Sequence, residues 1–396
     1  ERGIGFFGGD ADNFEYPRNT FDIAFLRAYE NGKPANVVNR FKWSRAGAKE
    51  AELLFVSGHP GRTARLLTSS ALKTERDVRV PFLLDLFRRR ELTTQQFILR
   101  GKKEKMVAES DLFSWQNSRK LYVGKVRGLQ DPKLMKDKES FEKELLLAPS
   151  YSFVKAELTE GLKLVEEAQS TIREIYTPYV LLVRGLGFDS RLFDYAGSIA
   201  SGNQDFAKAV LESRTSEPPI NLEYEEVKLR DSLTHLVEEL GAESWTVSRM
   251  MQYGNGPADL AHKFVYGTAL SDPTQHQWLI RGGLQSAQQS NDPMIGLASL
   301  VKLHNEYYSR RWNSAIEQER RGYSKISDAL FKIYGTDRYP DATFTLRLSF
   351  GTMFGYGENR RMVLPWTTIG DAYRHSLEFG NQGDHKLPVR WSQRKQ

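Results

Sequence analysis

The hydrophobic pattern of this chain changes twice along its length, and this change constrains the fold more than any other feature. Residues 1–70 contain short runs rich in aromatic and β-branched side chains, separated by turn signals. Residues 71–335 instead repeat apolar side chains at the three- and four-residue spacing of a helix. From residue 336 to residue 396 the β-type pattern returns. We therefore expect an α+β protein in which a large helical domain is inserted between two β regions.

Short runs in the first β region are predicted as strands. They cover residues 22–29, 37–43 and 52–57. Between the first two runs, Asn31-Gly32 is a dipeptide typical of hairpin turns. The last β region has one strongly alternating segment, residues 343–350, and is too short to close a barrel by itself.

Two apolar stripes carry the helical prediction. The first follows the spacing of one helix face and consists of Leu158, Leu162, Val165, Ile172 and Ile175. The second consists of Leu229, Leu233, Leu236, Val237 and Leu240, with Gly241 as the expected helix stop. The runs do not recur at a fixed period, so a solenoid is not predicted.

Composition excludes several classes of protein. The chain has no cysteine, which rules out disulfides, thiolate nucleophiles and cysteine-based metal sites. No run of eighteen apolar residues is present, so no membrane-spanning helix is expected. Residues Glu1–Phe14 lack the pattern of a signal peptide. The net charge of +6 permits an acidic partner, but acidic residues are interleaved throughout, and nucleic acid is not the favoured partner.

The densest chemical signal is GGDADNFEYPRNTFD at residues 8–22. Four carboxylates, two asparagines and an arginine crowd this segment, just before a predicted strand. Each polar group buried without a partner costs about 1–3 kcal/mol, so these groups must pair, bind a ligand or face water.

Residue chemistry alone leaves four interpretations of this segment open. It could be a solvated loop whose carboxylates accept from local backbone amides. Asp10, Asp12 and Glu15 could ligate calcium, although the EF-hand frame is absent. A carboxylate pair could serve a glycosidase. Finally, Asp22 could orient the histidine of a nucleophilic triad from the start of the strand.

The same segment, continued by IAFLRAYENGKPA, resembles the signature of the bacterial dipeptidyl-peptidase 7/11 family of serine exopeptidases. Further similar segments follow in the family's order along nearly the whole chain. They are LFVSGHPGRTARLLT at residues 54–68, QNSRKLYVGKVRGLQDP at residues 116–132 and YPDATFTLRLSFG at residues 339–351.

The resemblance implies a chymotrypsin-like double β-barrel with a large inserted α-helical cap domain, incomplete at both ends in this chain. It also implies an enzyme that releases dipeptides from free N-termini through an acyl-enzyme. By position, Asp22 matches the triad aspartate, and Asn13 with Phe14 matches the pair that grips the substrate's α-amino group. Asn117 matches a second amine-binding asparagine in the helical domain. A homodimer and a periplasmic or secreted location are further implications of the resemblance.

The chain departs from the family in its missing nucleophile and base. It contains neither a Gly-Asn-Ser-Gly run nor a G-x-S-x-G elbow, and His59 occupies a turn where the family has Asn. We therefore expect the 396-residue chain to be inactive alone. No cofactor and no catalytic metal are expected, because no motif pairs the other histidines, which are His235, His262, His276, His304, His375 and His385.

Two alternatives to the peptidase interpretation stay open at the level of sequence. A helical module with a basic face, including residues 88–90, could bind nucleic acid. A catalytically silent relative could retain Asn13 and Phe14 and bind peptides without cleaving them.

Overall fold

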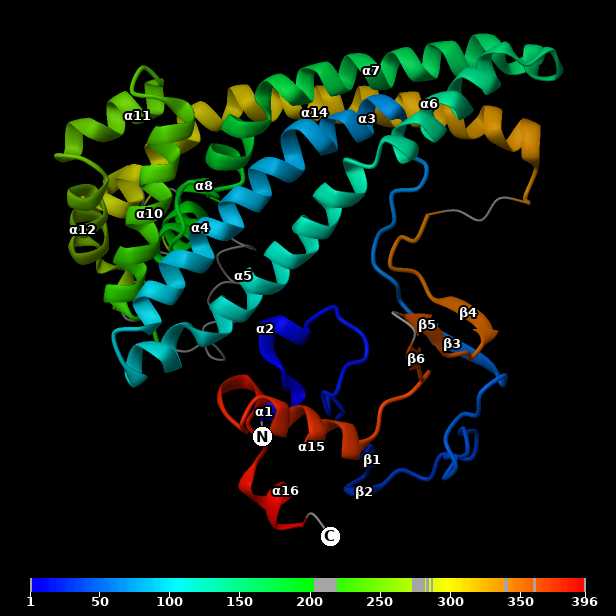
Figure 1. Ribbon diagram of the computed structural model, residues 1–396. Coiled ribbons are helices and arrows are strands. Elements are labelled where there is room, and N and C mark those ends of the chain that lie inside the picture. Colours follow the sequence, from blue (N-terminus) through cyan, green and yellow to red (C-terminus); the bar gives the residue numbers. More distant parts are fainter. Residues whose placement is uncertain are drawn as a thin grey trace. The chain divides into compact units, whose positions relative to one another are not determined.

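The structure is a computed structural model that describes residues 2–202, 219–272, 282, 285, 288–337, 341–358 and 361–394 (Figure 1). The chain forms two compact units. The first contains Glu1–Arg65 and Pro340–Gln396, and the second contains Leu66–Tyr339. Each unit is described by itself below.

The first unit is built from short elements. In chain order they are α1 (Arg2–Gly5), α2 (Gly9–Asp12), β1 (Tyr29–Glu30), β2 (Lys33–Pro34), β3 (Leu53–Gly58), β4 (Arg347–Thr352), β5 (Tyr356–Glu358), β6 (Arg361–Val363), α15 (Ile369–Glu378), the 3₁₀ helix η6 (Gly383–His385) and α16 (Val389–Gln393).

The strands of the described residues pair in three two-stranded antiparallel sheets, β1–β2, β3–β4 and β5–β6. The β3–β4 pair runs from Leu53 opposite Thr352 to Gly58 opposite Arg347. None of these sheets closes into a barrel, so the predicted double barrel is not found within the described residues. β3 comes from the first β region and β4 from the last, so the two regions share a sheet. The division of these regions into separate barrel lobes stays a prediction.

The strand predictions for residues 22–29 and 37–43 were largely wrong, whereas the prediction at residues 52–57 is confirmed by β3. The Asn31-Gly32 turn is also confirmed, with φ of 52° and 75°, and it joins β1 to β2. A strand forms only where a neighbour satisfies its backbone groups. Among the described residues, no strand pairs with residues 22–28 or 37–43.

A small hydrophobic core holds the two ends of the first unit together. Ile4 and Phe7 from the beginning of the chain pack with Ala372 of α15 and with Leu387. Phe7 is fully buried. These contacts place the segment of residues 8–22 beside the last part of the chain.

The second unit is helical. Its elements are α3 (Ser69–Thr74), the π-helical turn η1 (Glu75–Arg79), α4 (Val80–Ile98), α5 (Lys102–Leu129), α6 (Pro132–Leu147), the 3₁₀ helix η2 (Pro149–Val154), α7 (Lys155–Pro178), the π-helical turn η3 (Tyr179–Val183), α8 (Arg191–Ser201), α10 (Leu222–Leu240), α11 (Trp245–Met250), the 3₁₀ helix η4 (Met251–Tyr253), α12 (Pro257–Gly267), the 3₁₀ helix η5 (Ala269–Ser271) and α14 (Pro293–Tyr334).

The helix predictions from both apolar stripes are confirmed. The first stripe lies on α7, which buries Leu158, Val165, Ile172 and Ile175. The second lies on α10, which ends before Gly241 as expected. The amide of Asn221 caps the start of α10 by accepting from the backbone N–H of Tyr224. The main core of this unit is formed by buried side chains of α8, α10, α12 and α14.

The long helices α7 and α14 lie side by side and antiparallel (Figure 1), and two glycines set their spacing. A Cβ placed on Gly322 would stand 2.8 Å from the carbonyl oxygen of Gly161, and one on Gly161 would stand 2.9 Å from that of Gly322. No side chain fits between the two backbones at this point.

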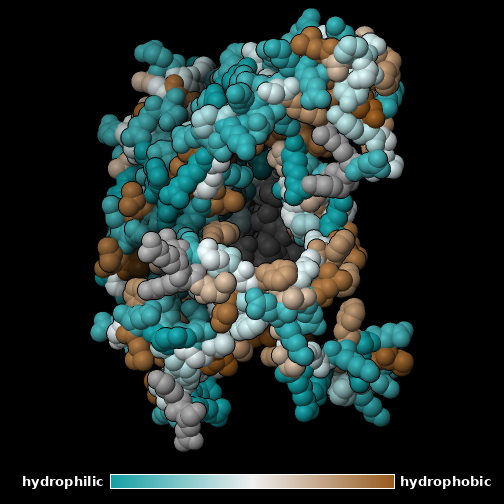
Figure 2. All heavy atoms as spheres, turned by 45° about the vertical axis from the view of Figure 1, so that its right-hand side comes forward, coloured by the Kyte–Doolittle hydropathy of each residue, from teal (hydrophilic) through white to brown (hydrophobic). Residues whose placement is uncertain are grey.

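Hydrophobic side chains also occur on the surface. In the face shown in Figure 2 they are interspersed with hydrophilic ones. Several of the exposed apolar side chains belong to the irregular part of the first unit, among them Phe25, Leu26, Phe41 and Trp43. Among the described residues, no helix is both long enough and apolar enough to span a membrane.

His235 of α10 lies in the interior of the second unit. Its side chain is 2% exposed and its ring stacks on that of Phe82, with the centroids 5.7 Å apart. Neither ring nitrogen has a hydrogen-bond partner among the described residues. Burial lowers the pKa of the His235 imidazole below its ordinary value, because the charged form would lose its hydration.

We expect Gly322→Ala to destabilise the helical unit by about 1–3 kcal/mol, because the methyl group forces α14 away from α7. The control is Gly124→Ala on α5, where a Cβ meets nothing within 4 Å. There the better helix propensity of alanine should stabilise the protein by about 0.5–1 kcal/mol. Chemical unfolding followed by circular dichroism measures both effects, and equal effects at the two positions would contradict the packing argument.

We expect His235→Leu to reduce the acid sensitivity of the protein. The pKa of His235 is lowered in the folded protein, so the unfolded chain takes up the proton more readily. The contribution of His235 to stability is therefore fully present above its pKa in the unfolded chain. It is lost as the pH falls through its pKa in the folded protein. Unfolding free energies at about pH 8 and about pH 5 test this, since the histidine changes charge between them. The same pH dependence in both proteins would refute it.

Candidate functional site

The segment of residues 8–22 begins with two glycines that its backbone requires. Gly8 and Gly9 have positive φ, 83° and 57°. A Cβ on Gly8 would overlap the side chain of Asp12, and one on Gly9 would overlap that of Asp384. Glycine at both positions therefore lets the chain turn tightly against these two carboxylates.

Asn13 and Phe14 follow α2 and face different environments. Asn13 is 5% exposed, and its Oδ1 accepts a hydrogen bond of 3.1 Å from Nη1 of Arg18. Phe14 has a φ of 62° and is 61% exposed. The amide of Asn13 is thus held in one orientation, and the aromatic ring next to it is open to solvent.

Backbone and side-chain hydrogen bonds fix the rest of the segment. The hydroxyl of Tyr16 donates to the carbonyl of Leu364 at 2.7 Å. The hydroxyl of Thr367 donates to the carbonyl of Arg18 at 3.1 Å. These contacts tie the segment to the residues between β6 and α15.

The structure places Asp22 at the end of this segment, in the same unit as Asn13 and Phe14. The expectation that it starts a strand was wrong, because residues 22–28 have no regular structure. Asp22 is exposed and lies beside Gly5 of α1. Its carboxylate has no hydrogen bond or ion pair among the described residues, so both oxygens can accept.

Asn117, the other predicted site residue, lies on α5 of the second unit and is exposed. The prediction that it acts together with Asn13 joins two units that are described separately, and it stays a prediction.

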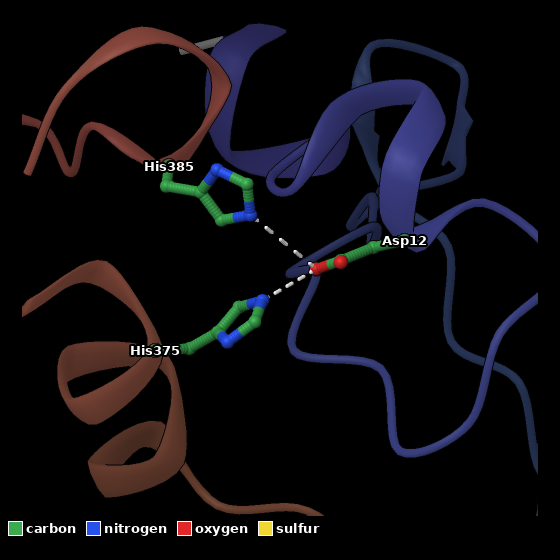
Figure 3. A group of neighbouring side chains, drawn as sticks. All are labelled: Asp12, His375 and His385. Atoms are coloured by element: carbon green, nitrogen blue, oxygen red, sulfur yellow. Dashed lines mark hydrogen bonds and ion pairs between the residues drawn. The ribbon is translucent and has the colours of Figure 1, made fainter. Parts of the chain in front are cut away.

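Next to Asn13, three side chains from distant parts of the chain converge (Figure 3). Nε2 of His375, on α15, is 2.8 Å from Oδ2 of Asp12. Nε2 of His385, in η6, is 4.0 Å from the same oxygen. The ligating atoms of the three residues all lie within 4.8 Å of one another.

Local structure positions both histidines. A capping box starts α15, in which Thr368 and Asp371 exchange hydrogen bonds, and these bonds lower the pKa of Asp371 below its usual value. This places His375 one turn further along the helix. The hydroxyl of Ser376 donates to the carbonyl of His385 at 2.7 Å and fixes the backbone of η6 against α15.

Aromatic rings surround the two imidazoles. The ring of Phe379 stacks on that of His385 with centroids 3.7 Å apart. The buried ring of Phe7 meets both imidazoles edge to face, at 6.0 Å from His375 and 5.8 Å from His385. The polar atoms of the cluster therefore have partly apolar surroundings.

Two cavities adjoin this region of the first unit. One, of about 470 Å³, is lined by residues that include Pro17, Asp371, His375 and Glu378. The other, of about 760 Å³, is lined by residues of α15 and α16. Asn13, Phe14 and Asp22 line neither cavity.

The calcium interpretation of Asp10, Asp12 and Glu15 receives no support from the geometry. In the described part of the chain, Asp12 with His375 and His385 is the only group of three or more histidine or acidic side chains close enough to share a metal ion. Sequence reasoning missed this group because Asp12 and His375 are 363 positions apart. The prediction of no catalytic metal rests on spacing along the chain, which does not reveal residues that only the fold brings together. His276, one of the histidines named in the sequence analysis, lies outside the described residues.

Comparison with protein families gives one match along the whole chain. The family model described as Peptidase S46 matches residues 1–396. The chain is 24% identical over 386 residues to the Asp/Glu-specific dipeptidyl-peptidase of Shewanella putrefaciens, covering 89% of this chain and 52% of that protein. It is 22% identical over 422 residues to dipeptidyl-peptidase 7 of Capnocytophaga gingivalis, covering 98% of this chain and 57% of that protein.

A solved structure shares the fold. The crystal structure of Porphyromonas endodontalis DPP11 in complex with the dipeptide Arg-Asp matches with a TM-score of 0.77 at 17% identity. The match covers 98% of this chain and 59% of that one. The chain thus spans between half and three fifths of the length of these relatives. Neither the nucleic-acid-binding nor the silent peptide-binding alternative is supported by these comparisons.

We expect Arg18→Met to loosen the segment around Asn13, because the hydrogen bond from a charged group is lost. Such bonds contribute about 1.5–3 kcal/mol, so amide exchange at Asn13 and Glu15 should become at least about tenfold faster. Hydrogen exchange read by mass spectrometry measures the change. Arg40→Met, an exposed arginine of the same unit, is the control. Equal exchange in both variants would mean that Arg18 does not hold the segment.

Proposed function

The chain belongs to the peptidase S46 family, and from this we propose that it forms part of a serine-type dipeptidyl aminopeptidase. Such an enzyme releases dipeptides from the free N-terminus of peptides. The observation that carries the proposal is the buried Asn13, whose amide is fixed by Arg18 beside the exposed ring of Phe14.

This arrangement suits recognition of a peptide's α-ammonium group. Oδ1 of Asn13 accepts from Arg18, and an amide oxygen, which has two lone pairs, is also a suitable acceptor for an ammonium group. The exposed face of Phe14 adds cation–π attraction of about 0.5–2 kcal/mol. The positive charge of Arg18 opposes a cation, but two other carboxylates of the same segment, Asp10 and Glu15, offset it.

In the proposed enzyme, Asp22 accepts a hydrogen bond from Nδ1 of the base histidine and so fixes its tautomer. The histidine takes the proton of the nucleophilic serine as the hydroxyl oxygen attacks the carbonyl carbon of the substrate's second residue. The proton then passes to the leaving amine, and water hydrolyses the acyl-enzyme. We assign the histidine and the serine to sequence other than these 396 residues, which contain no Gly-Asn-Ser-Gly run.

The remaining parts of the proposal follow from the family likeness. The strands of the first unit belong to a chymotrypsin-like double β-barrel that is complete only in the longer protein. The helical unit acts as a cap that limits the substrate at its amino end, with Asn117 of α5 as a second ligand for the ammonium. Peptides with a free N-terminus are the substrates. The protein works as a homodimer in the periplasm or outside the cell.

We expect Asp22→Asn in the full-length protein to lower kcat by about 10⁴-fold while the fold is retained, because the histidine loses its correct tautomer. Asn13→Ala should mainly raise KM, because it removes an amine ligand. Steady-state hydrolysis of a chromogenic dipeptide substrate separates the two effects. The matched control is Glu50→Gln, an exposed carboxylate of the same unit, which should leave both constants unchanged.

Full activity of the Asp22→Asn protein would refute the triad role. Robust hydrolysis by the 396-residue chain alone would refute the assignment of serine and histidine to other sequence.

A further inference from the structure

The cluster of Asp12, His375 and His385 has the composition of a transition-metal site. One carboxylate oxygen and two imidazole nitrogens are ligands that zinc accepts, and zinc sites with three protein ligands leave a fourth position for water. We propose that these three residues bind a divalent metal ion of the zinc class.

The separations between the ligand atoms fit a bound ion after small movements. Tetrahedral zinc with bonds of about 2.0–2.1 Å places neighbouring ligand atoms about 3.3 Å apart. In the structure, Oδ2 of Asp12 lies 2.8 Å from Nε2 of His375 and 4.0 Å from Nε2 of His385. Of these two separations, one must lengthen and the other must shorten, each by less than about 1 Å, which side-chain rotations supply. The two imidazole nitrogens, which lie within 4.8 Å of each other, must settle at the same spacing.

The state of His385 is a second, independent observation. Its residue is 8% exposed, and its Nε2 has no hydrogen-bond partner in the described part of the chain. A buried polar atom without a partner costs about 1–3 kcal/mol. This nitrogen points toward the carboxylate of Asp12 (Figure 3), where a shared metal ion would satisfy it.

Residues around the three ligands would hold the imidazole rings in position for a metal ion. Nδ1 of His375 lies 3.3 Å from Oε2 of Glu378, an arrangement that directs the other ring nitrogen toward the ion. The amide oxygen of Asn381 accepts from the backbone N–H of Leu387 at 2.9 Å and so holds the turn that carries His385. The rings of Phe7 and Phe379 limit access of water.

The ligand set distinguishes among metals. Calcium and magnesium prefer oxygen ligands, and the cluster offers oxygen only from Asp12. Imidazole favours zinc and its first-row neighbours such as cobalt. A bound ion would join α2 to α15 and η6 at the residue that precedes Asn13. It would thereby hold the proposed ammonium-binding residues in place, although metal binding itself does not depend on peptidase activity.

The test uses the full 396-residue chain, freed of metal with a chelator and titrated with Zn²⁺ in a calorimeter. We expect one equivalent to bind, with Mg²⁺ and Ca²⁺ showing no binding at the same concentrations. His385→Gln and His375→Gln should each weaken Zn²⁺ binding on the order of 100-fold or more. Glu378→Gln should weaken it by about 10–100-fold, as outer partners do.

His262→Gln is the matched control. Nδ1 of His262 lies 3.2 Å from a carboxylate oxygen of Glu226, so it forms a histidine–carboxylate pair that belongs to no metal-ligating group of three within the described residues. Zn²⁺ affinity should be unchanged in this variant. An equal loss in His262→Gln and His385→Gln would show adventitious binding and overturn the proposal.

A second measurement needs no variant and covers the case in which a substitution prevents folding. Co²⁺ bound at the cluster should give the visible absorption of a low-coordinate nitrogen–oxygen site. Zn²⁺ should also protect His375 and His385, but not His262, from acylation by diethyl pyrocarbonate, as read by peptide mass mapping. Absence of Zn²⁺ binding, or binding without this selective protection, would refute the site.

Discussion

The first unit depends on the attachment of the start of the chain to its last part. Helices of four residues, such as α1 and α2, are not stable by themselves. The conformational entropy lost in nucleating a helix exceeds the stabilisation from so few hydrogen bonds. Burial of Phe7 against Ala372 and Leu387 supplies the missing stability. The position of Asn13 therefore depends on residues more than 350 positions away.

The helical unit could be predicted well from the sequence because its order is local. An apolar stripe at helical spacing needs only one buried face, and α7 and α10 each provide it. What the stripes could not predict is how closely the helices approach. The contact at Gly161 and Gly322 depends on which two residues meet between antiparallel helices, and no local pattern contains that information.

The β regions show the opposite case. Alternation predicted residues 52–57 correctly because β4 is available as a partner, whereas residues 22–28 and 37–43 have equally suitable side chains but no partner strand among the described residues. The same limit applies to the site. The motif at residues 8–22 could be singled out from its composition, but its contact with His375 and His385 arises from pairing across the chain.

In the proposed peptidase, Asp22 is a catalytic carboxylate that is in place before it meets its histidine. An exposed carboxylate keeps its hydration and costs the isolated unit nothing, whereas a buried one without a partner would be strongly destabilising. In the proposed peptidase, the histidine that donates to Asp22 would also remove it from water, and their hydrogen bond gains strength as the surroundings become less polar. The rigid part of the site in this chain is accordingly the segment around Asn13, where Arg18 holds the amide. On this view, substrate recognition is built into this unit, and the charge of Asp22 acquires its orienting role only when the triad is assembled.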